Sequence, residues 1–182
     1  MIELIKLEQN DFPIFKSWIK NQDELFHFAG PILKFPITDD QLINYTNDSQ
    51  RIVYKVILKD SKKIIGNAEL NFENALPRLS RILIGEKTDR KKGLGKILVG
   101  KMLEILFYEY NFQNVDLNVF DWNNVAINCY KSVGFVINPD LVYKHDYKNE
   151  TWTAINMTIS RQDWLDNNSK KRKQEAPKPN PQ

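Results

Sequence analysis

The chain of 182 residues has a single cysteine, two histidines and no long apolar run. Cys129 therefore has no second cysteine with which to form an internal disulfide, and His27 and His145 lie too far apart to form a metal-ligand motif. No segment approaches the roughly 18 apolar residues that a membrane helix needs. These absences argue against zinc, redox and membrane functions, and we expect a cytoplasmic protein that holds no metal.

Positive charge is concentrated at the C-terminal end. Residues 169–182 hold five Lys or Arg and one Glu, so the net charge of +3 leaves the rest of the chain near −1. This stretch contains three prolines and no large apolar side chain, which predicts a disordered tail at 168–182 after one domain at 1–167. A basic tail can bind nucleic acid or acidic partners, but a body near neutrality makes nucleic acid the weakest functional candidate.

The pattern of apolar residues predicts an α+β domain. Strand-like alternation or β-rich composition covers residues 2–7, 51–60, 62–72, 78–85, 114–120, 134–137 and 149–159. Helical spacing begins at residue 11, at the capping box formed by Thr38 and Gln41, at Leu94 and at residue 125. The helix that begins at Leu94 has the most regular apolar face and is predicted to be the longest.

The stretch RKKGLG, residues 90–95, lies between a predicted strand and this long helix. Glycine lets the backbone turn tightly or lets a ligand approach its amides, and a helix N-terminus attracts anions. Residues 87–96 carry a net charge of +4. Leu98 replaces the third glycine of a dinucleotide fingerprint, and Ile97 replaces the Ser or Thr of a Walker loop. The stretch therefore predicts a phosphate site of another kind.

A second pattern, N-x-x-A-x-x-x-Y-x-x-x-G-F, follows at residues 123–135. Together with R-x-x-G-x-G at residues 90–95, it resembles the GNAT N-acetyltransferase superfamily. The resemblance spans roughly residues 2–159. The region of Trp18, the loop at 29–36 and the Thr38 capping box resemble the ribosomal-protein N-terminal acetyltransferase branch. Lys91 is a departure, because many members of the superfamily have glycine directly after the arginine.

The resemblance implies a mixed, largely antiparallel sheet of about seven strands with helices on both faces. The strands at 79–84 and 114–120 would run parallel and splay apart, and acetyl-CoA, the co-substrate, would lie in the opening. In the family the pantetheine arm bonds to strand backbone and the pyrophosphate to amides at the helix start. The implied cofactor-binding residues are Ile82, Leu83, Ile84, Arg90, Lys91, Lys92, Gly93, Leu94, Gly95, Lys96 and Asn123. Asn123 is either a helix cap, a contact to the cofactor arm, or both.

The resemblance also implies direct transfer of an acetyl group to a primary amine, in a small molecule or at a peptide N-terminus. By the family pattern Tyr130 protonates the leaving thiolate; the alternative is a core tyrosine. Glu69 is the best single candidate for the general base, because Ala68 and Leu70 belong to the other face of its strand. A solvated or ion-paired carboxylate is the alternative, and many relatives use a chain of waters. Cys129 is interpreted as core packing.

The acceptor is expected to enter past residues 21–48, where five acidic residues and Lys34 give a net charge of −4. Such a lip suits a cationic amine, although charge runs are more often solvated faces. An arylamine, a polyamine, an aminoglycoside and a peptide N-terminus all remain open as acceptors. The alternative function is a non-catalytic acyl-CoA-binding or protein-interaction module with the same fold, and we expect a monomer or homodimer.

Overall fold

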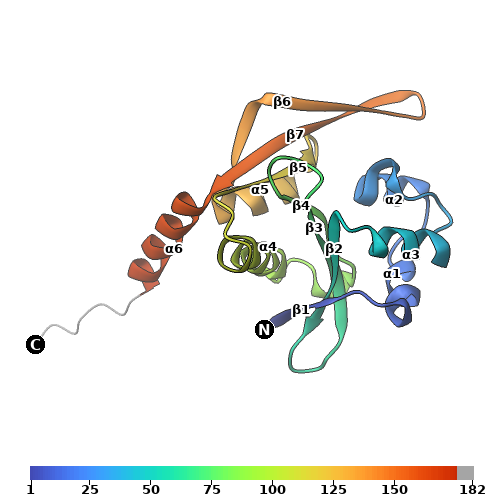
Figure 1. The fold of residues 1–182 in the computed structure, drawn as a ribbon, viewed down its shortest axis with the longest axis horizontal. Helices are drawn as coiled ribbons and strands as arrows, with labels where there is room; N and C mark the ends of the chain where they lie inside the picture. The colour runs from blue at the N-terminus through green and yellow to red at the C-terminus, as the bar shows by residue number, and fades with distance from the viewer. Residues whose placement is uncertain (176–182) are drawn as a thin grey trace, which may run out of the picture.

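The computed structural model describes residues 1–175, which form a seven-stranded mixed sheet with helices on both faces (Figure 1). The sheet order is β1-β2-β3-β4-β5-β7-β6, and every neighbouring pair is antiparallel except β4 and β5. The predicted fold class and its parallel pair are therefore confirmed. The strands are β1 (Ile2–Lys6), β2 (Arg51–Leu58), β3 (Ile64–Asn71), β4 (Arg78–Ile84), β5 (Asn114–Phe120), β6 (Val136–Tyr147) and β7 (Glu150–Ser160).

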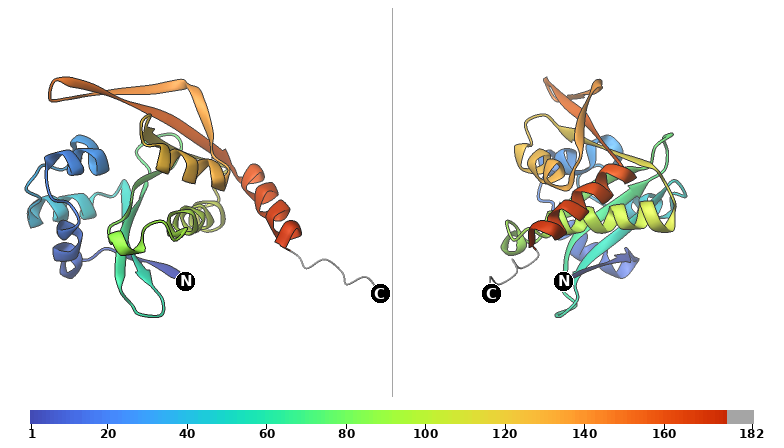
Figure 2. Two further views of the ribbon diagram at one scale, coloured as in Figure 1. Left: turned by 180° about the vertical axis from the view of Figure 1, so that it is seen from behind. Right: turned by 90° about the vertical axis from the view of Figure 1, so that its left-hand side faces the viewer.

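The helices form two layers, with α1 to α3 on one side of the sheet and α4 and α5 on the other (Figures 1 and 2). The first layer has α1 (Phe12–Ser17), α2 (Gln22–Ala29) and α3 (Asp39–Asn47). The second has α4 (Leu94–Glu104), which continues as a π-helical turn (Ile105–Glu109), and α5 (Asn124–Val133). The final helix, α6 (Arg161–Glu175), leads away from the sheet. None of the helices in the described part of the chain is long and apolar enough to cross a membrane.

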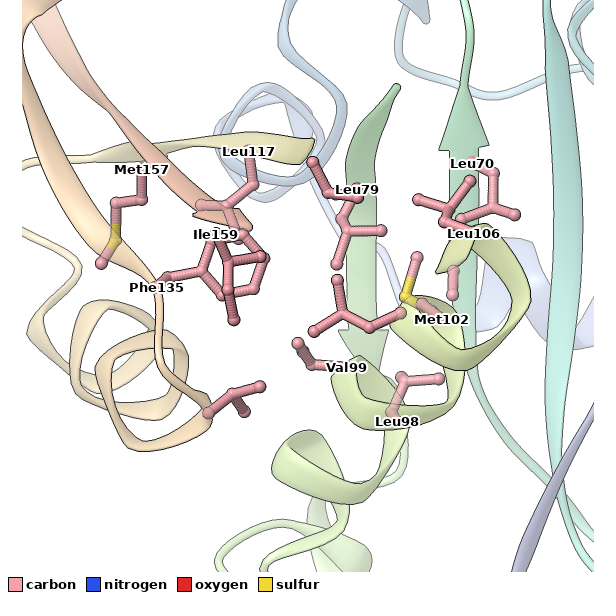
Figure 3. Close-up of a cluster of buried hydrophobic side chains, with 14 of the residues drawn as sticks. Leu70, Leu79, Leu98, Val99, Met102, Leu106, Leu117, Phe135, Met157 and Ile159 are labelled. Atoms are coloured by element: carbon pink, nitrogen blue, oxygen red, sulfur yellow. The ribbon is translucent and has the colours of Figure 1, made fainter. Parts of the chain in front are cut away.

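Each helical layer buries its own hydrophobic cluster against the sheet. The larger cluster centres on α4, whose apolar stripe lies against the strands as its spacing predicted. Figure 3 shows Leu98, Val99 and Met102 of α4 in one cluster with Leu79 of β4, all of them almost fully buried. The smaller cluster joins the apolar side chains of α1 to α3 to Val53 of β2. The sheet is thus held rigidly on both faces around β4.

The helix α2 was not predicted, although the sequence carries a signal for it. Asn21 caps this helix by accepting a hydrogen bond from Glu24 N at 2.9 Å, and the Glu24 carboxylate accepts one from Lys20 N at 2.7 Å. The sequence Asn21-x-x-Glu24 thus has the form of the motif that identified α3, with Asn in place of Thr, and its glutamate reaches the amide just before the cap. The nearby prolines, Pro31 and Pro36, had favoured a loop.

At the C-terminal end one strand is longer than the sequence pattern indicated, and one helix, α6, was not predicted. β6 was predicted only to residue 137, because Asn138-Pro139-Asp140 has the composition of a turn. It continues because β6 is the edge strand of the sheet, where a register shift between Asn138 and Val142 accommodates the proline. α6 runs through the domain boundary predicted at residue 167. Of the disordered tail predicted at 168–182, residues 168–175 are helical, and residues 176–182 lie outside the described residues.

The contact between β3 and β4 is sensitive to a single methyl group at Gly66. An added Cβ would lie 2.1 Å from the backbone oxygen of Leu83, so the two strands would have to separate. Gly66→Ala is expected to lower the free energy of unfolding by about 1–3 kcal/mol. Gly100→Ala in α4 is the matched control: it meets nothing within 4 Å and should raise that free energy by up to about 1 kcal/mol. Urea denaturation measures both, and an unchanged Gly66→Ala variant would contradict the close approach.

Candidate active site

The strands β4 and β5 diverge after a short parallel contact. They pair only at Arg78 with Asp116 and at Leu79 with Leu117. Beyond these two pairs, β4 continues alongside β3, whereas β5 pairs with β7 along its whole length. The predicted splay is therefore present, and it leaves residues 80–84 of β4 with an edge that faces no strand (Figure 1).

The main chain of β4 at this edge presents donors and acceptors to the gap. Gly85 N donates to Ile65 O of β3 at 2.8 Å, so the alternation of the strand turns the main chain of Ile84 away from β3. By the same alternation Ile82 also faces the gap, whereas Leu83, which pairs with Asn67, faces β3. Of the three predicted backbone contacts, Ile82 thus presents its N–H and C=O groups to the opening, and Ile84 presents its N–H, because the Ile84 carbonyl accepts a hydrogen bond from Arg90 Nε at 2.8 Å.

The N-terminus of α4 has the features of an anion site. Gly93 is the N-cap with a φ of +76°, and no side chain caps the helix. A Cβ at Gly93 would meet nothing within 4 Å, so the position is open. The first amides of the helix, at Leu94, Gly95 and Lys96, have no carbonyl one turn earlier to which they can donate. The predicted phosphate contacts at this end remain Gly93, Leu94, Gly95, Lys96 and the exposed Lys91.

The loop before α4 is anchored by Asp89, which the sequence analysis counted only as a charge. Its buried carboxylate accepts from Lys92 Nζ at 2.9 Å and from Lys63 Nζ at 3.1 Å, and these bonds lower the pKa of Asp89. Arg90 is also committed to the protein: its Nε donates to Ile84 O at 2.8 Å and its amide to Lys87 O at 3.2 Å. The side chains of Lys92 and Arg90 therefore brace the loop in this structure.

Tyr130 lies on α5, beside the N-terminus of α4. Its ring is half-buried and contacts Phe135 edge to face at 6.1 Å, and burial raises its pKa. Among the residues that the structure describes, no group forms a hydrogen bond with its hydroxyl. The neighbouring Cys129 is directed toward Gly95 of α4, where an added Cβ would lie 3.5 Å from its sulfur. Cys129 thus packs between the two helices, as predicted.

Asn123 connects α5 to a histidine of the opposite helical layer. Its Oδ1 caps α5 by accepting from Ala126 N at 3.2 Å, and its Nδ2 lies 3.2 Å from His27 Nε2 of α2. Because an amide nitrogen only donates, His27 Nε2 accepts and the imidazole is neutral. Burial also lowers the pKa of His27. The predicted capping role of Asn123 is present, while its contact to the cofactor arm stays a prediction.

Glu69, the predicted general base, lies on β3 with no exposed surface. Both carboxylate oxygens accept from Arg81 Nη1, at 2.6 and 2.7 Å, and Tyr45 donates its hydroxyl to Oε2. Glu69 is therefore ion-paired, which was one of the alternatives to a general base. The carboxylate has no exposed edge from which to reach an amine, although its role in catalysis stays a prediction.

A group of aromatic rings meets at the C-terminal end of β5. The hairpin of β6 and β7 reaches over α2 (Figure 1 and the left view of Figure 2), and the Tyr147 ring stacks on Phe26 with centroids 4.0 Å apart. Trp122 lies 4.6 Å from His27 and is 47% exposed. This aromatic group consists of Phe26, His27, Phe120, Trp122, Tyr147 and Trp152. Sequence analysis missed it, because three distant segments supply its members.

The acidic lip predicted at residues 21–48 is largely neutralised by cations from outside that segment. Asp39 pairs with Lys16 at 2.7 Å, and Asp48 pairs with Arg51 at 2.7 Å. Asp23 pairs with Lys148 and accepts from the Tyr147 hydroxyl. Of the five acids, only Glu24 and Asp40 have no cationic partner among the described residues. The entrance is therefore less negative than the net charge of −4, counted over residues 21–48 alone, indicated.

The described residues contain no group of three or more His, Cys, Asp or Glu side chains that could hold a metal ion. The geometry instead presents main-chain donors at the gap, an uncapped helix N-terminus and, on α5, a phenol with no hydrogen bond to a described residue.

Comparison with known proteins supports this description. The model of the Acetyltransferase (GNAT) family matches residues 10–135. A crystal structure of spermidine N-acetyltransferase from Vibrio cholerae in complex with CoA and spermine is similar to this chain, with a TM-score of 0.76 and 21% identity. The match covers 90% of this chain and 98% of that one. A dodecameric structure of the Vibrio cholerae enzyme, at 21% identity, has a TM-score of 0.69 over 90% of this chain and 96% of that one.

The left-handed conformation of Gly93 gives a test of the anion site. Gly93→Ala is expected to weaken the binding of CoA about tenfold, because a side chain at a positive φ costs roughly 1–2 kcal/mol and shifts the amides that follow. Gly95→Ala is the control, since its Cβ would contact Cys129 at an ordinary 3.5 Å and its amide would remain. Isothermal titration calorimetry measures both affinities. Equal losses in the two variants would contradict a site built on the Gly93 turn.

Proposed function

This chain belongs to the GNAT acetyltransferase family, and we propose that it transfers an acetyl group directly from acetyl-CoA to a primary amine. Membership identifies it as an N-acetyltransferase that depends on acyl-CoA. The acceptor amine, the direct route and the residues that act in it belong to the proposal. The observation that carries the proposal is the gap between β4 and β5, which lies next to an uncapped helix N-terminus.

Two features of the gap fit acetyl-CoA. The unpaired edge of β4 offers the N–H and C=O of Ile82 and the N–H of Ile84 to the amides of a pantetheine arm, as an added strand would use them. The amides at residues 93–96 offer donors to a diphosphate, and the positive end of the helix dipole favours its charge. The exposed side chains of Lys91 and Lys96 supply further positive charge at that end.

The proposed reaction needs few groups from the protein. A neutral amine attacks the thioester carbonyl, so a C–N bond forms, and the Ile82 N–H at the gap stabilises the negative charge on the oxygen. The C–S bond then breaks, and Tyr130 donates its proton to the departing thiolate. The proton that the amine loses passes to water, from which Tyr130 is reprotonated.

The proposed entrance for the acceptor is lined by the aromatic group. Ring faces attract the ammonium group of an amine before it loses its proton, and they bury its carbon chain. The similar Vibrio cholerae structure, described with spermine, makes a polyamine one acceptor to test first. A peptide N-terminus is the second, following the branch that the sequence resembles. We further propose a monomer or homodimer in the cytoplasm, which light scattering and fractionation can test against the dodecamer of that relative.

Tyr130→Phe is expected to lower the turnover number by more than tenfold, because the thiolate then departs without its proton. Burial raises the pKa of Tyr130, so the phenol keeps its proton through neutral pH. The wild-type rate should therefore show no loss from Tyr130 ionisation up to about pH 10. Thiol release from acetyl-CoA measures the rate. Tyr108→Phe, at an exposed tyrosine after α4, is the matched control and should retain the wild-type rate; equal rates in the two variants would remove Tyr130 from the mechanism.

The same assay separates catalysis from binding alone. A panel of spermidine, spermine, an arylamine, an aminoglycoside and short peptides should include at least one amine that accelerates thiol release from acetyl-CoA. A thermal shift with CoA but no turnover on any amine would favour the non-catalytic acyl-CoA-binding alternative.

A further inference from the structure

β4 contains a bulge immediately before the residues that face the gap. Asn67 of β3 pairs with Leu83 and Glu69 pairs with Ser80, so two residues of β4, Arg81 and Ile82, lie opposite one residue of β3. Arg81 has a φ of +47°, a conformation that a residue with a side chain rarely adopts. An extra residue of this kind changes which main-chain groups of the following segment point to each side.

Two side chains of β3 hold Arg81 in this conformation. Asn67 Nδ2 donates to the backbone oxygen of Arg81 at 3.1 Å. The C=O of Arg81 and the N–H of Ile82 belong to one trans peptide and point in opposite directions. Because the carbonyl is bound on the side of β3, the N–H of Ile82 is turned away from β3 and toward the gap.

Glu69 holds the side chain of the same residue. Its carboxylate accepts from Arg81 Nη1 at 2.6 and 2.7 Å, and Asn71 Nδ2 donates to it at 3.2 Å. The second cation facing it is Arg51 of β2, whose Nη1 lies 3.5 Å away. Glu69 is thus surrounded by two guanidinium groups and has no exposed surface.

Tyr45 of α3 completes the arrangement from the other helical layer. Its hydroxyl donates to Glu69 Oε2, and both guanidinium groups lie over its ring, with Arg51 at 5.5 Å and Arg81 at 5.6 Å from the centroid. Tyr45 is 4% exposed, so these charges interact away from water. The remaining charged groups at this network are Asp48 and Glu73, which pair with Arg51.

We propose that Glu69 and Asn67 are positioning residues that hold the β4 bulge through Arg81, and that Glu69 is not the base that deprotonates the acceptor. Asn67 fixes the peptide that points the Ile82 N–H at the thioester oxygen, and Glu69 fixes the side chain of the strained residue. The inference rests on the proposed acetyl transfer and assigns it a geometric requirement in β3. It replaces the general-base role predicted for Glu69 from strand alternation.

The test compares Glu69→Gln with Asn67→Ala. The second variant removes no titratable group, because the side chain of asparagine does not ionise. Steady-state rates are measured against acetyl-CoA from pH 6 to 9 with the best amine of the panel. Asn67→Ala removes the hydrogen bond that holds the Arg81–Ile82 peptide. Glu69→Gln removes the charge that holds the Arg81 side chain. Both variants should therefore lower kcat/KM for acetyl-CoA about tenfold and keep the shape of the wild-type pH profile. Loss of the acidic limb in Glu69→Gln alone, with Asn67→Ala at the wild-type rate, would show a general base and overturn the proposal.

A double variant covers the case in which Glu69→Gln folds poorly. Arg81→Gly suits a positive φ and removes the guanidinium that Glu69 balances. Combining it with Glu69→Gln should restore kcat/KM to within about threefold of the wild type, because neither the strain nor the unbalanced charge remains. A double variant as slow as Glu69→Gln would show that Glu69 does not act through Arg81, and the proposal would fail.

Asp11→Asn is the matched control for the loss of a buried charge. Asp11 is a buried carboxylate that pairs with Lys55 at 2.8 Å, away from β4. This variant should lose thermal stability but keep the wild-type kcat/KM; an equal loss of kcat/KM would make the effect one of general stability and overturn the proposal. If the wild-type protein acetylates no amine, the proposed function fails by itself. CoA titration of the same variants then decides the inference, which requires weaker binding in Glu69→Gln and Asn67→Ala than in Asp11→Asn.

Discussion

The divergence of β4 from β5 after two residue pairs is the constraint on which the proposed chemistry depends. A sheet normally pairs every main-chain group, and a strand that leaves its neighbour exposes N–H and C=O groups that need another partner. Here Leu79 and Leu117, at the last pair, are buried against the α4 side of the core (Figure 3). The core therefore holds the two strands together at their two paired residues. The main-chain groups of β4 after Leu79 have no strand partner on the side of β5 and can bind a ligand.

Buried charges hold the parts of the site that the sheet does not. Asp89 anchors the loop before α4, and Glu69 gathers two guanidinium groups next to the bulge of β4. Such groups are expensive to bury unless each has its partners, so they fix one geometry and tolerate few others. The rigidity of the gap thus comes from polar groups on the sheet's interior as much as from its apolar packing.

Much of the cofactor side could be predicted from the sequence, because its signals are local. The glycines and cations at residues 90–95 and the apolar spacing of α4 are properties of one short segment, and so is the cap at Asn123. The acceptor side could not be predicted in the same way. Its rings come from α2, β5 and the β6–β7 hairpin, and the partners of its acidic residues lie outside the segment over which charge was counted. The bulge at Arg81 was also invisible, since nothing in a strand-like pattern marks an extra residue.

The position of β7 has a consequence for how the chain is made. β7 follows β6 in the sequence, yet it lies between β5 and β6 in the sheet. With only two residues paired to β4, the edge of β5 waits for residues 150–160 before its hydrogen bonds can form. A nascent chain on the ribosome therefore carries β5, with its apolar Val115 and Val119, as an open edge until residues 150–160 have been synthesised. Pairing with β7 then covers this edge and ends the period in which it can pair with another chain.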